Sequence, residues 1–360
     1  MQTLATQQQA YHLNPNLFFY LRDGEFIVWD YLNHQQWIVK SDYINALERI
    51  AKGQSISVSM TQDLLQSGMV SAREFSDLHW GWDIVSKIYH LSSSDIFQDV
   101  QKSEDEFVEE YLATCEQLDQ EEIPAVNCDY KFDACFDIRV DQTPLGEVFR
   151  KRKTTRNFDG SSITYDELGS LLFTSCGEIH ESWEDLQQAG YMTHSGRRSF
   201  PSGGGLYPIR YIVLALNVED IIPGVYEYVP QANGLKLLKL LDKHLVFNDL
   251  TDILNSQFFC KGLAAGIFFV PDFSKEWEKY PHSRSYRDVF LDIAHCSQNV
   301  LLAATALELR TWITAAFKDE KLRNFLGIKE ASTYPAEFIG IGHGENHSLP
   351  EAFRIRVKDS

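Results

Sequence analysis

The sequence predicts an α+β protein, in which helices pack on one sheet and a small module of strands and helices comes first. Two observations predict this class. From about residue 144 onward, apolar strand-like runs alternate with helical patterns. Before that, residues 1–75 hold three short strand-like runs followed by two helical patterns. The length of 360 residues, with 44% hydrophobic side chains, suits about two to three domains.

The N-terminal module begins with LFFYLRDGEFIVWDYLNHQQWIVK, residues 17–40. Asp23-Gly24 is a strong hairpin signal between the first two strands. SDYINALERIAKG then fits a helix that Ser41 can cap and Gly53 can end, and SVSMTQDLLQSGMV fits a second helix. We expect a domain over residues 1–75. A connecting segment over 76–143 is expected to be irregular except for the acidic, helical run SEDEFVEEYLATCEQLDQEEIP.

The third region, residues 144–360, carries the predicted sheet. TYDELGSLLFTSC fits a helix capped by Thr164, with Glu167 at the capping-box spacing. The long run from Ser283 to Leu309 fits an amphipathic or fully buried helix, and DEKLRNFLG fits a short one. RTWITAAF, residues 310–317, is either a strand or a loop. The predicted strands are RYIVLAL, GVYEYVP, LKLLKL, KGLAAGIFFVP and AEFIGIGHG.

Composition argues against several classes of function. The formal net charge of −18 opposes binding to nucleic acid and to anionic membranes. No run approaches the ~20 apolar residues of a spanning helix, and the N-terminus lacks the pattern of a signal peptide, so we expect a cytoplasmic protein. The six cysteines form no CxxC pair, which favours reduced, mostly buried thiols over disulfides, a catalytic thiol or a metal site.

A basic cluster stands out in this acidic chain: five of the seven residues from Arg150 to Arg156 are basic. In an extended backbone Arg152, Thr154 and Arg156 would point to one face. Two guanidiniums and a hydroxyl on one face suit a phosphate, because arginine binds phosphate through paired donors. A solvated basic patch is the alternative.

The stretch PSGGGLYP, residues 201–208, places three glycines just before a buried strand. No helix follows the glycines and Ser202 precedes them, so neither a dinucleotide fingerprint, a P-loop nor a nucleophile elbow is supported. Glycine lacks Cβ, so a planar ligand can approach the backbone closely. The sequence therefore predicts a loop that lies against a flat polar heterocycle, with a simple turn as the alternative.

Together, RKTTRNF and PSGGGLYP resemble the FMN-dependent nitroreductase superfamily, and within it the SagB-type dehydrogenases that include azoline oxidases. Further matches follow in order over about residues 145–345: GVYEY, KYPHSRSYRDVFLDIAHC and TAAFKDEKLRNFLGI. The resemblance implies a nitroreductase-like fold with a mainly antiparallel sheet, FMN as cofactor and a homodimer. The first 75 residues resemble the PqqD-like winged-helix module, which implies leader-peptide recognition by an added strand, or else a domain that only packs on the rest.

The resemblance also implies roles for individual residues. Arg152, Thr154 and Arg156 would hold the phosphate and pyrimidine edge of FMN. Ser202, Gly203 and Gly204 would line its ring, and Gln298 could reach it. We expect these two segments to converge on one flavin.

Lys279-Tyr280 matches the Lys-Tyr pair that serves catalysis in azoline oxidases. Lys279 or Tyr280 would remove the acidic ring proton while the neighbouring carbon gives hydride to the flavin. A snorkelling surface pair is the alternative. His295 is expected to be structural. Departures from the family at Gly204, Ile209-Arg210 and Pro281 affect the substrate side more than the phosphate side.

Three functions follow from these expectations. The first is an FMN-dependent dehydrogenase that oxidises a peptide-borne thiazoline or oxazoline to an azole, with a precursor peptide, and possible cyclodehydratase, as partners. The second is an NAD(P)H-dependent nitro or quinone reductase, or an oxidase of a carrier-tethered heterocycle, on the same fold. The third is a non-catalytic scaffold that binds the precursor.

Overall fold

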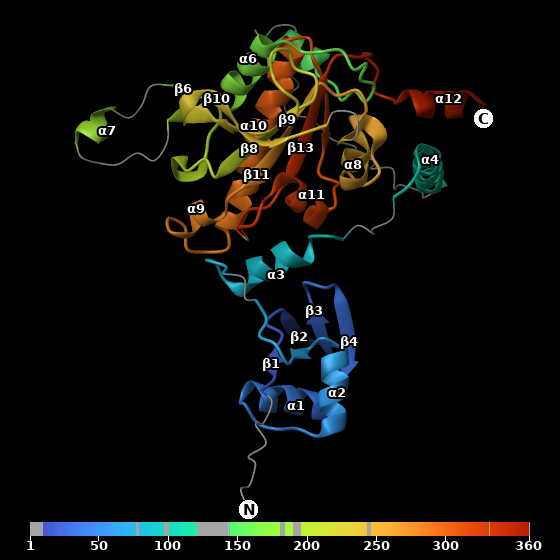
Figure 1. The fold of residues 1–360 in the computed structure, drawn as a ribbon, viewed down its shortest axis with the longest axis vertical. Coiled ribbons are helices and arrows are strands. Elements are labelled where there is room, and N and C mark those ends of the chain that lie inside the picture. Colours follow the sequence, from blue (N-terminus) through green and yellow to red (C-terminus); the bar gives the residue numbers. More distant parts are fainter. Residues whose placement is uncertain are drawn as a thin grey trace, which may run out of the picture. The chain divides into compact units, whose positions relative to one another are not determined.

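The computed structural model describes residues 10–76, 79–96, 101–120, 143, 145–180, 184–189, 196–242, 246–330 and 332–359. The chain divides into two compact units, Met1–Ile96 and Phe97–Ser360 (Figure 1). The division falls after Ile96, whereas the sequence places boundaries at residues 75 and 143; those three domains remain predictions. Pro144, Cys128 and Cys135 lie outside the described residues.

The first unit contains an antiparallel sheet in the order β2-β3-β4. Asp23 and Gly24 form the predicted hairpin turn, with φ of 54° and 83°, because a two-residue turn of this kind needs positive φ at both positions. Since no described strand pairs with β2 or β4 on its outer side, both edges of this sheet are open. The strands are β2 (Leu17–Arg22), β3 (Glu25–Asp30) and β4 (Gln35–Val39).

Helices α1 (Ser41–Ala51) and α2 (Val58–Gln66) cover one face of this sheet and share a buried core with it. The prediction that Ser41 caps α1 is wrong: Ser41 is already the first helical residue, and the cap position is Lys40, whose side chain makes no capping bond. A short pair of strands, β1 (His12–Leu13) and β5 (Val70–Ser71), closes the module.

The prediction that residues 76–143 are irregular up to the acidic run is wrong, because this stretch contains a helix. Helix α3 (Ile84–Ser92) begins after Asp83, whose side chain accepts hydrogen bonds from the amides of Val85 and Ser86. Asp83 is a residue type that commonly caps helices, so the sequence did carry a signal for the start of this nine-residue helix.

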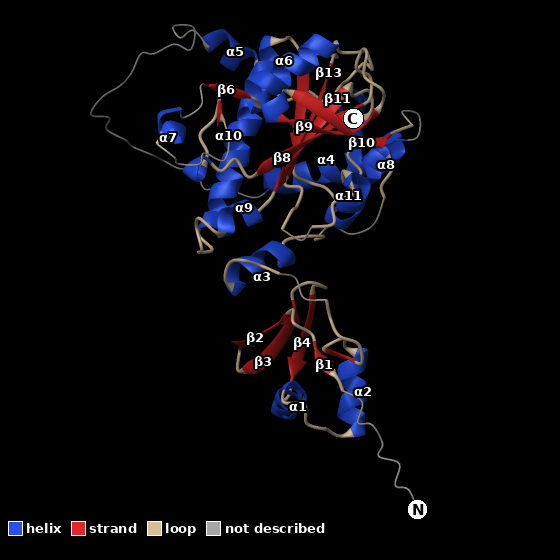
Figure 2. Ribbon diagram, turned by 60° about the vertical axis from the view of Figure 1, so that its left-hand side comes forward, coloured by secondary structure: helices blue, strands red, loops and turns tan. Residues whose placement is uncertain are grey.

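The second unit is built on a six-stranded, fully antiparallel sheet in the order β10-β9-β8-β11-β13-β12 (Figure 2). Residues 310–317, which the sequence left open, begin with an edge strand. The strands are β8 (Ile209–Ala215), β9 (Gly224–Val229), β10 (Gly234–Leu240), β11 (Ala265–Pro271), β12 (Arg310–Thr314) and β13 (Glu337–Gly342).

Both faces of this sheet are covered, and the alternation of side chains along β8 explains why. Tyr211 and Val213 point into a core shared with α6 (Tyr165–Cys176) and α10 (Ser285–Ala306). Ile212 and Leu214 point into the opposite core, which α8 (Val246–Ile253) and α11 (Asp319–Leu326) complete. The α+β class with an antiparallel sheet is therefore confirmed.

Helix α10 is long and apolar enough, by length and composition, to cross a membrane, although no such run was expected from the sequence. In the fold Ile293, Cys296 and Val300 are buried against the sheet. The apolar character of α10 is thus used in core packing.

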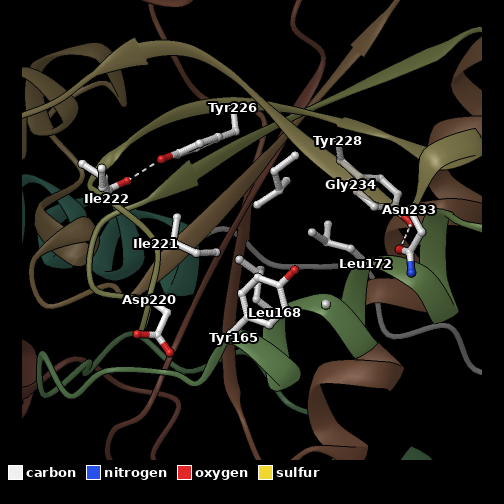
Figure 3. Close-up of a pocket in the computed structure, with 12 residues that line it drawn as sticks. Tyr165, Leu168, Leu172, Asp220, Ile221, Ile222, Tyr226, Tyr228, Asn233 and Gly234 are labelled. Carbon is white, nitrogen blue, oxygen red and sulfur yellow. Dashed lines mark hydrogen bonds between the residues drawn. The ribbon is translucent and has the colours of Figure 1, made fainter.

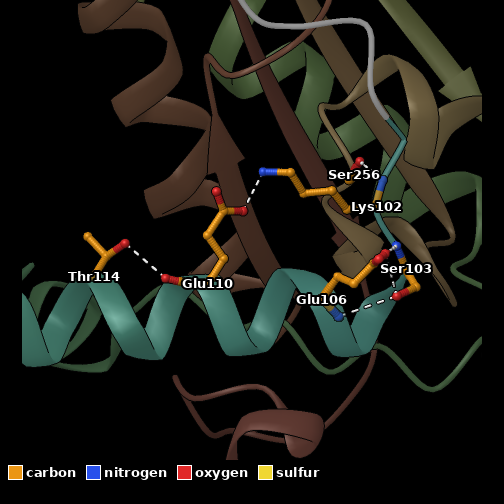
Figure 4. Close-up of polar contacts among 6 residues, drawn as sticks. All are labelled: Lys102, Ser103, Glu106, Glu110, Thr114 and Ser256. Carbon is orange, nitrogen blue, oxygen red and sulfur yellow. Dashed lines mark hydrogen bonds and ion pairs between the residues drawn. The ribbon is translucent and has the colours of Figure 1, made fainter.

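The acidic run forms helix α4 (Glu104–Gln120), as predicted. Ser103 donates its amide and hydroxyl to the carboxylate of Glu106 at 2.8 Å each, and the Glu106 amide donates back to the Ser103 hydroxyl at 3.3 Å (Figure 4). The Lys102 amide donates to the hydroxyl of Ser256 at 2.9 Å, which ties the start of α4 to the turn that follows α8. The remaining short α-helices and strands are α5 (Gly146–Lys151), β6 (Glu178–His180), α7 (Glu184–Gln188), β7 (Arg197–Arg198), α9 (Ser274–Trp277) and α12 (Glu351–Asp359). Three 3-10 helices also occur: η2 (Gly203–Gly205), η3 (Pro230–Ala232) and η4 (Phe258–Cys260).

The capping box of α6 gives a first prediction. Thr164 and Glu167 make both reciprocal bonds of the motif, as the sequence predicts. We expect Thr164→Ala to lower the free energy of unfolding of the second unit by about 1 kcal/mol, because a helix amide loses its acceptor. Thr164→Ser, which keeps the hydroxyl, should stay near the parent in chemical denaturation. Equal stability of the two variants would contradict this role.

Candidate active site

The glycine-rich loop is fixed to helix α10 by side-chain hydrogen bonds. The hydroxyl of Ser202 donates to the carboxylate of Asp292 and accepts a hydrogen bond from the amide of Tyr207 at 2.8 Å. The amide of Gly203 donates to the second oxygen of Asp292 at 3.4 Å. Ser202 thus holds the loop in shape, and the exposed backbone of Gly204 and Gly205 is what the loop offers to a ligand.

Lys279 and Tyr280 meet this loop at Gly204. The Lys279 ammonium donates to the Gly204 carbonyl at 2.8 Å. A Cβ at Gly204 would lie 2.6 Å from both Lys279 Nζ and the Tyr280 hydroxyl oxygen. Gly204 also has φ of 60°, where L-residues are strained. The position therefore needs glycine for its backbone angle and for the approach of the Lys-Tyr pair.

Short helix α9 and the start of α10 position the Lys-Tyr pair. The Tyr280 amide donates to the carbonyl of Glu276 at 2.9 Å. The hydroxyl of Ser285, at the start of α10, lies 3.0 Å from the Tyr280 carbonyl. Lys279 itself is exposed and Tyr280 half-buried, so the pair is open to a substrate.

Carboxyl groups lie beneath this site. Glu276 and Asp292 are 1% and 3% exposed. Burial raises the pKa of Glu276 to about 7; the charges of Asp292 and Asp288 add to this rise, and the charge of Lys279 opposes it. Burial also raises the pKa of Asp292, against hydrogen bonds from Ser202 and Gly203. The sequence analysis missed these residues, although Asp288 and Asp292 recur four residues apart on an apolar helix.

The predicted cationic edge lies beside strand β12. Thr154 pairs with Thr311 in a parallel bridge, and the amide of Thr155 donates to the Thr311 carbonyl at 2.9 Å. Thr155 is buried and Lys153 exposed, whereas Arg152, Thr154 and Arg156 are all half-buried.

The cations of this edge differ in their partners. Arg156 donates to the Ser348 carbonyl at 3.2 Å and lies over the ring of Phe259 at 5.4 Å, and burial lowers the pKa of Arg156. Within the described part of the chain, the guanidinium of Arg152 has no hydrogen-bond or ion-pair partner. Arg310, which the sequence analysis missed, begins β12 and donates only to the Gly344 carbonyl, at 3.4 Å, among the described residues. Arg152 and Arg310 are thus available for an anion.

The loop and the cationic edge lie at opposite ends of α10 within one chain. The loop is bonded to Asp292, near the start of the helix, whereas Thr154 pairs with Thr311, just after the helix ends at Ala306. A helix rises 1.5 Å per residue, so these ends are about 20 Å apart. Figure 2 shows α5 and α9 at opposite ends of the unit. The expected convergence of the two segments within one chain is therefore not observed, and Gln298 lies between them, exposed on α10.

The described cysteines are free thiols. Cys176 and Cys296 are buried free thiols with their sulfur atoms 3.6 Å apart, and burial raises the pKa of Cys176. Among the described residues, no group of three or more His, Cys, Asp or Glu side chains could hold a metal ion.

A pocket of about 340 Å³ opens between the start of α6 and the hairpin of β9 and β10 (Figure 3). Leu168 and Leu172 from α6 and Tyr226 and Tyr228 from β9 line it. None of the predicted site residues lines this pocket, so it is separate from the Lys279 site.

Comparison with known proteins now identifies the family. Residues 149–343, more than half of the chain, match the nitroreductase family. The chain belongs to the nitroreductase family. The nitroreductase domain thus contains both the cationic edge and the loop with Lys279 and Tyr280.

Individual relatives give detail. A putative nitroreductase of Methanocaldococcus jannaschii is 28% identical over 203 residues, 56% of this chain and 92% of the relative. The microcin B17-processing protein McbC of Escherichia coli is 27% identical over 152 residues, 41% of this chain, and the match spans only 55% of McbC. The E. coli microcin synthetase McbBCD complex with truncated pro-MccB17 has a similar fold, with a TM-score of 0.50 and 18% identity over 80% of this chain and 92% of that chain.

Two glycine variants test the approach of the Lys-Tyr pair. Gly204→Ala and Gly205→Ala both place a Cβ at positive φ, 60° and 69°, so each should cost about 1 kcal/mol of stability. Only the Cβ at position 204 meets Lys279 and Tyr280, because no atom lies within 4 Å of the Cβ position at 205. We expect Gly204→Ala to change the rate at which the Lys279 amine reacts with an acylating reagent, and Gly205→Ala to leave that rate unchanged. Identical Lys279 reactivity in the two variants would contradict the contact.

Proposed function

We propose that this nitroreductase is an FMN-dependent dehydrogenase of the SagB type, which oxidises a peptide-borne azoline to an azole. Membership of the family and similarity to McbC support an oxidoreductase of modified peptides. The observation that carries the finer proposal is the close approach of Lys279 and Tyr280 to the exposed backbone of Gly204. A general reductase has no need of a base at that position.

The residues present fit FMN. Gly204 and Gly205 expose backbone with no side chain above it, and Arg152 is a half-buried cation without a protein partner in the described part of the chain. Arg152 and Thr154 would hold the phosphate or the pyrimidine edge, and Gly203 and Gly204 would lie against the ring. When bound, FMN accepts the two electrons that a dehydrogenation releases.

Lys279 and Tyr280 would handle the proton of the reaction. A lysine amine in its neutral form is a suitable acceptor for the acidic proton of an azoline ring, and Lys279 would supply it. The Tyr280 hydroxyl could donate a hydrogen bond to the same part of the substrate. The bond from Lys279 to the Gly204 carbonyl orients the amine along the loop. Asp292 keeps this loop in place through Ser202 and Gly203.

The geometry of α10 supports a homodimer. The two halves of the proposed site lie about 20 Å apart in one chain, which a second copy packed antiparallel along α10 would bring together. Gln298, Leu291 and His295 are exposed on this helix and would face the second copy. Each flavin would then be held by Arg152 and Thr154 of one copy and by the loop of the other.

The N-terminal unit would recruit the precursor peptide. Its sheet has open edges at β2 and β4 in the described part of the chain, and an extended leader segment could add there as a strand. Phe18, Leu21 and Ile38 are exposed apolar side chains of these strands and could contact the leader. A PqqD-like role of this unit, a cyclodehydratase partner and a cytoplasmic location belong to the same proposal.

The proposed function is tested by a visible absorption spectrum of the pure protein, before and after anaerobic addition of a synthetic thiazoline-containing peptide. We expect a yellow protein whose flavin absorption bleaches with the peptide. A colourless protein that takes up no FMN would favour the non-catalytic scaffold. Rapid bleaching by NAD(P)H with a small quinone as acceptor, unaffected by Lys279→Ala, would favour the general reductase.

Lys279→Ala should retain FMN and lower the rate of azole formation by at least about a hundredfold, because the proton acceptor is lost. The matched control is Lys275→Ala, an exposed lysine on α9 in the turn before. Turnover of the peptide and flavin content are measured in both. Unchanged turnover in Lys279→Ala would refute the assigned role.

Arg152→Ala should weaken FMN binding by about ten- to a hundredfold, as expected when a charge-assisted hydrogen bond to phosphate is lost. Lys153→Ala is the control, because Lys153 is exposed on the other side of the segment. Titration with FMN measures both. Equal affinity in the two variants would exclude Arg152 from the site.

A further inference from the structure

The pocket between α6 and the β9–β10 hairpin contains none of the residues of the Lys279 site (Figure 3). Its volume of about 340 Å³ is in the range of small-molecule sites. Leu168 and Leu172 of α6 line its base and are each at most 1% exposed. Ile221 and Leu235 also line the pocket and pack against the same core. The base of the pocket is therefore part of the hydrophobic core, which fixes its shape.

Three tyrosine side chains lie around this space. Tyr226 and Tyr228 are two residues apart on β9, so both point to the same face of the sheet. The Tyr226 hydroxyl donates to the Ile222 carbonyl at 2.7 Å. The Tyr228 hydroxyl donates to the side-chain oxygen of Asn233 at 2.9 Å. Tyr165, at the start of α6, points its hydroxyl toward the same space (Figure 3). The pocket therefore offers aromatic rings, two of which are held in place by hydrogen bonds.

Asp220 is the one charged residue among the described residues that line the pocket, and its charge is negative. Its side chain is exposed and so belongs to the opening of the pocket. In the described part of the chain its carboxylate has no hydrogen-bond or ion-pair partner. The whole chain carries a formal net charge of −18. Both charges attract a cation and repel an anion.

Gly169 keeps one wall of the pocket open. Tyr165, Leu168, Gly169 and Leu172 have the spacing of one helix face, so a side chain at position 169 would point toward the pocket. A Cβ at this position would meet no atom within 4 Å. Gly169 does not have positive φ, so its backbone angle does not require glycine. A larger side chain there would therefore fill the pocket without a change in the backbone.

We propose that this pocket binds an organic cation, namely an ammonium ion whose nitrogen carries methyl groups. Tyrosine rings attract a cation through their negative faces, and the carboxylate of Asp220 adds to this attraction. A fully methylated nitrogen needs no hydrogen-bond acceptor, which suits walls made of rings and aliphatic side chains. Because the pocket is separate from the Lys279 site, this binding does not depend on azoline oxidation.

The first test compares choline with 3,3-dimethylbutanol, the neutral analogue in which carbon replaces the charged nitrogen. Both carry a group of equivalent methyl protons, so saturation-transfer NMR on the full-length protein can follow each ligand by the same kind of signal. We expect choline to bind at least about fivefold more tightly, because only choline is charged. Equal affinity of the two ligands, or no binding of choline, would overturn the proposal.

The second test removes the charge of the pocket. Asp220→Asn keeps the shape of the side chain, and asparagine tolerates the φ of 58° at this position. We expect choline binding to weaken about two- to fivefold, since an exposed carboxylate is partly screened by solvent, and binding of the neutral analogue to stay unchanged. Asp166→Asn is the matched control, because Asp166 is an exposed carboxylate of α6 that does not line the pocket. Equal choline affinity in the two variants would overturn the proposal.

The third test fills the pocket. Gly169→Leu should weaken both ligands at least about tenfold, because the leucine side chain takes their space. Leucine is a better helix former than glycine, so α6 should persist. Unchanged choline binding in this variant would place the ligand elsewhere and overturn the proposal.

A parallel titration of the parent protein with the methyl amide of acetylated trimethyllysine identifies the source of the cation. Tighter binding of this probe than of choline would assign the pocket to a methylated lysine side chain of a peptide. Tighter binding of choline would assign it to a free small molecule. Either result supports a site for a methylated ammonium ion, whereas failure of both probes to bind would overturn it.

Discussion

The hydrogen bonds from Ser202 and Gly203 to Asp292 are the interactions on which the rest of the site depends. They join a loop with little side-chain bulk to the buried face of α10, and they fix where the Gly204 carbonyl points. Lys279 and Tyr280 approach that carbonyl because α9 and the start of α10 bring the chain back over the loop. The position of one buried carboxylate on one helix therefore sets the geometry of three separate segments.

Helix α10 also separates the two parts that a flavin would need. Its first half holds the loop, and its end precedes the strand that pairs with Thr154. Because these two parts lie about 20 Å apart along the helix, the proposed site would draw them from two copies. In such a dimer, the second copy would cover the exposed face of α10 that carries His295 and Gln298.

Much of the fold could be predicted from local signals. Features that depend on residues close in sequence could be predicted. They are the hairpin at Asp23-Gly24, the capping box at Thr164 and the apolar strands. Helix α3 was missed although Asp83 is a good capping residue and the predicted helix α2 is equally long. The cap of α1 was misplaced by one residue, because Ser41 is itself a good capping residue.

The sequence supplied candidate residues for a site but not their arrangement, and the roles of these residues stay predictions. Lys279 and Tyr280 lie against Gly204, a contact that no local pattern predicts, and the carboxyl groups beneath them were missed. Burial of Glu276 and Asp292 arises from tertiary packing, which no local pattern reveals. The distance between Arg152 and the loop likewise depends on the length of α10 and on where each segment meets it.

The most direct measurement of the central claim mixes two inactive variants, Arg152→Ala and Lys279→Ala, under conditions that let subunits exchange, with FMN kept limiting. If each site takes Arg152 from one copy and Lys279 from the other, a mixed dimer holds one intact site, and random mixing should restore about a quarter of the parent activity. If both residues served the same site within one chain, no mixture could contain an intact site. Activity that stays at the level of the separate variants, despite proven exchange, would contradict the account.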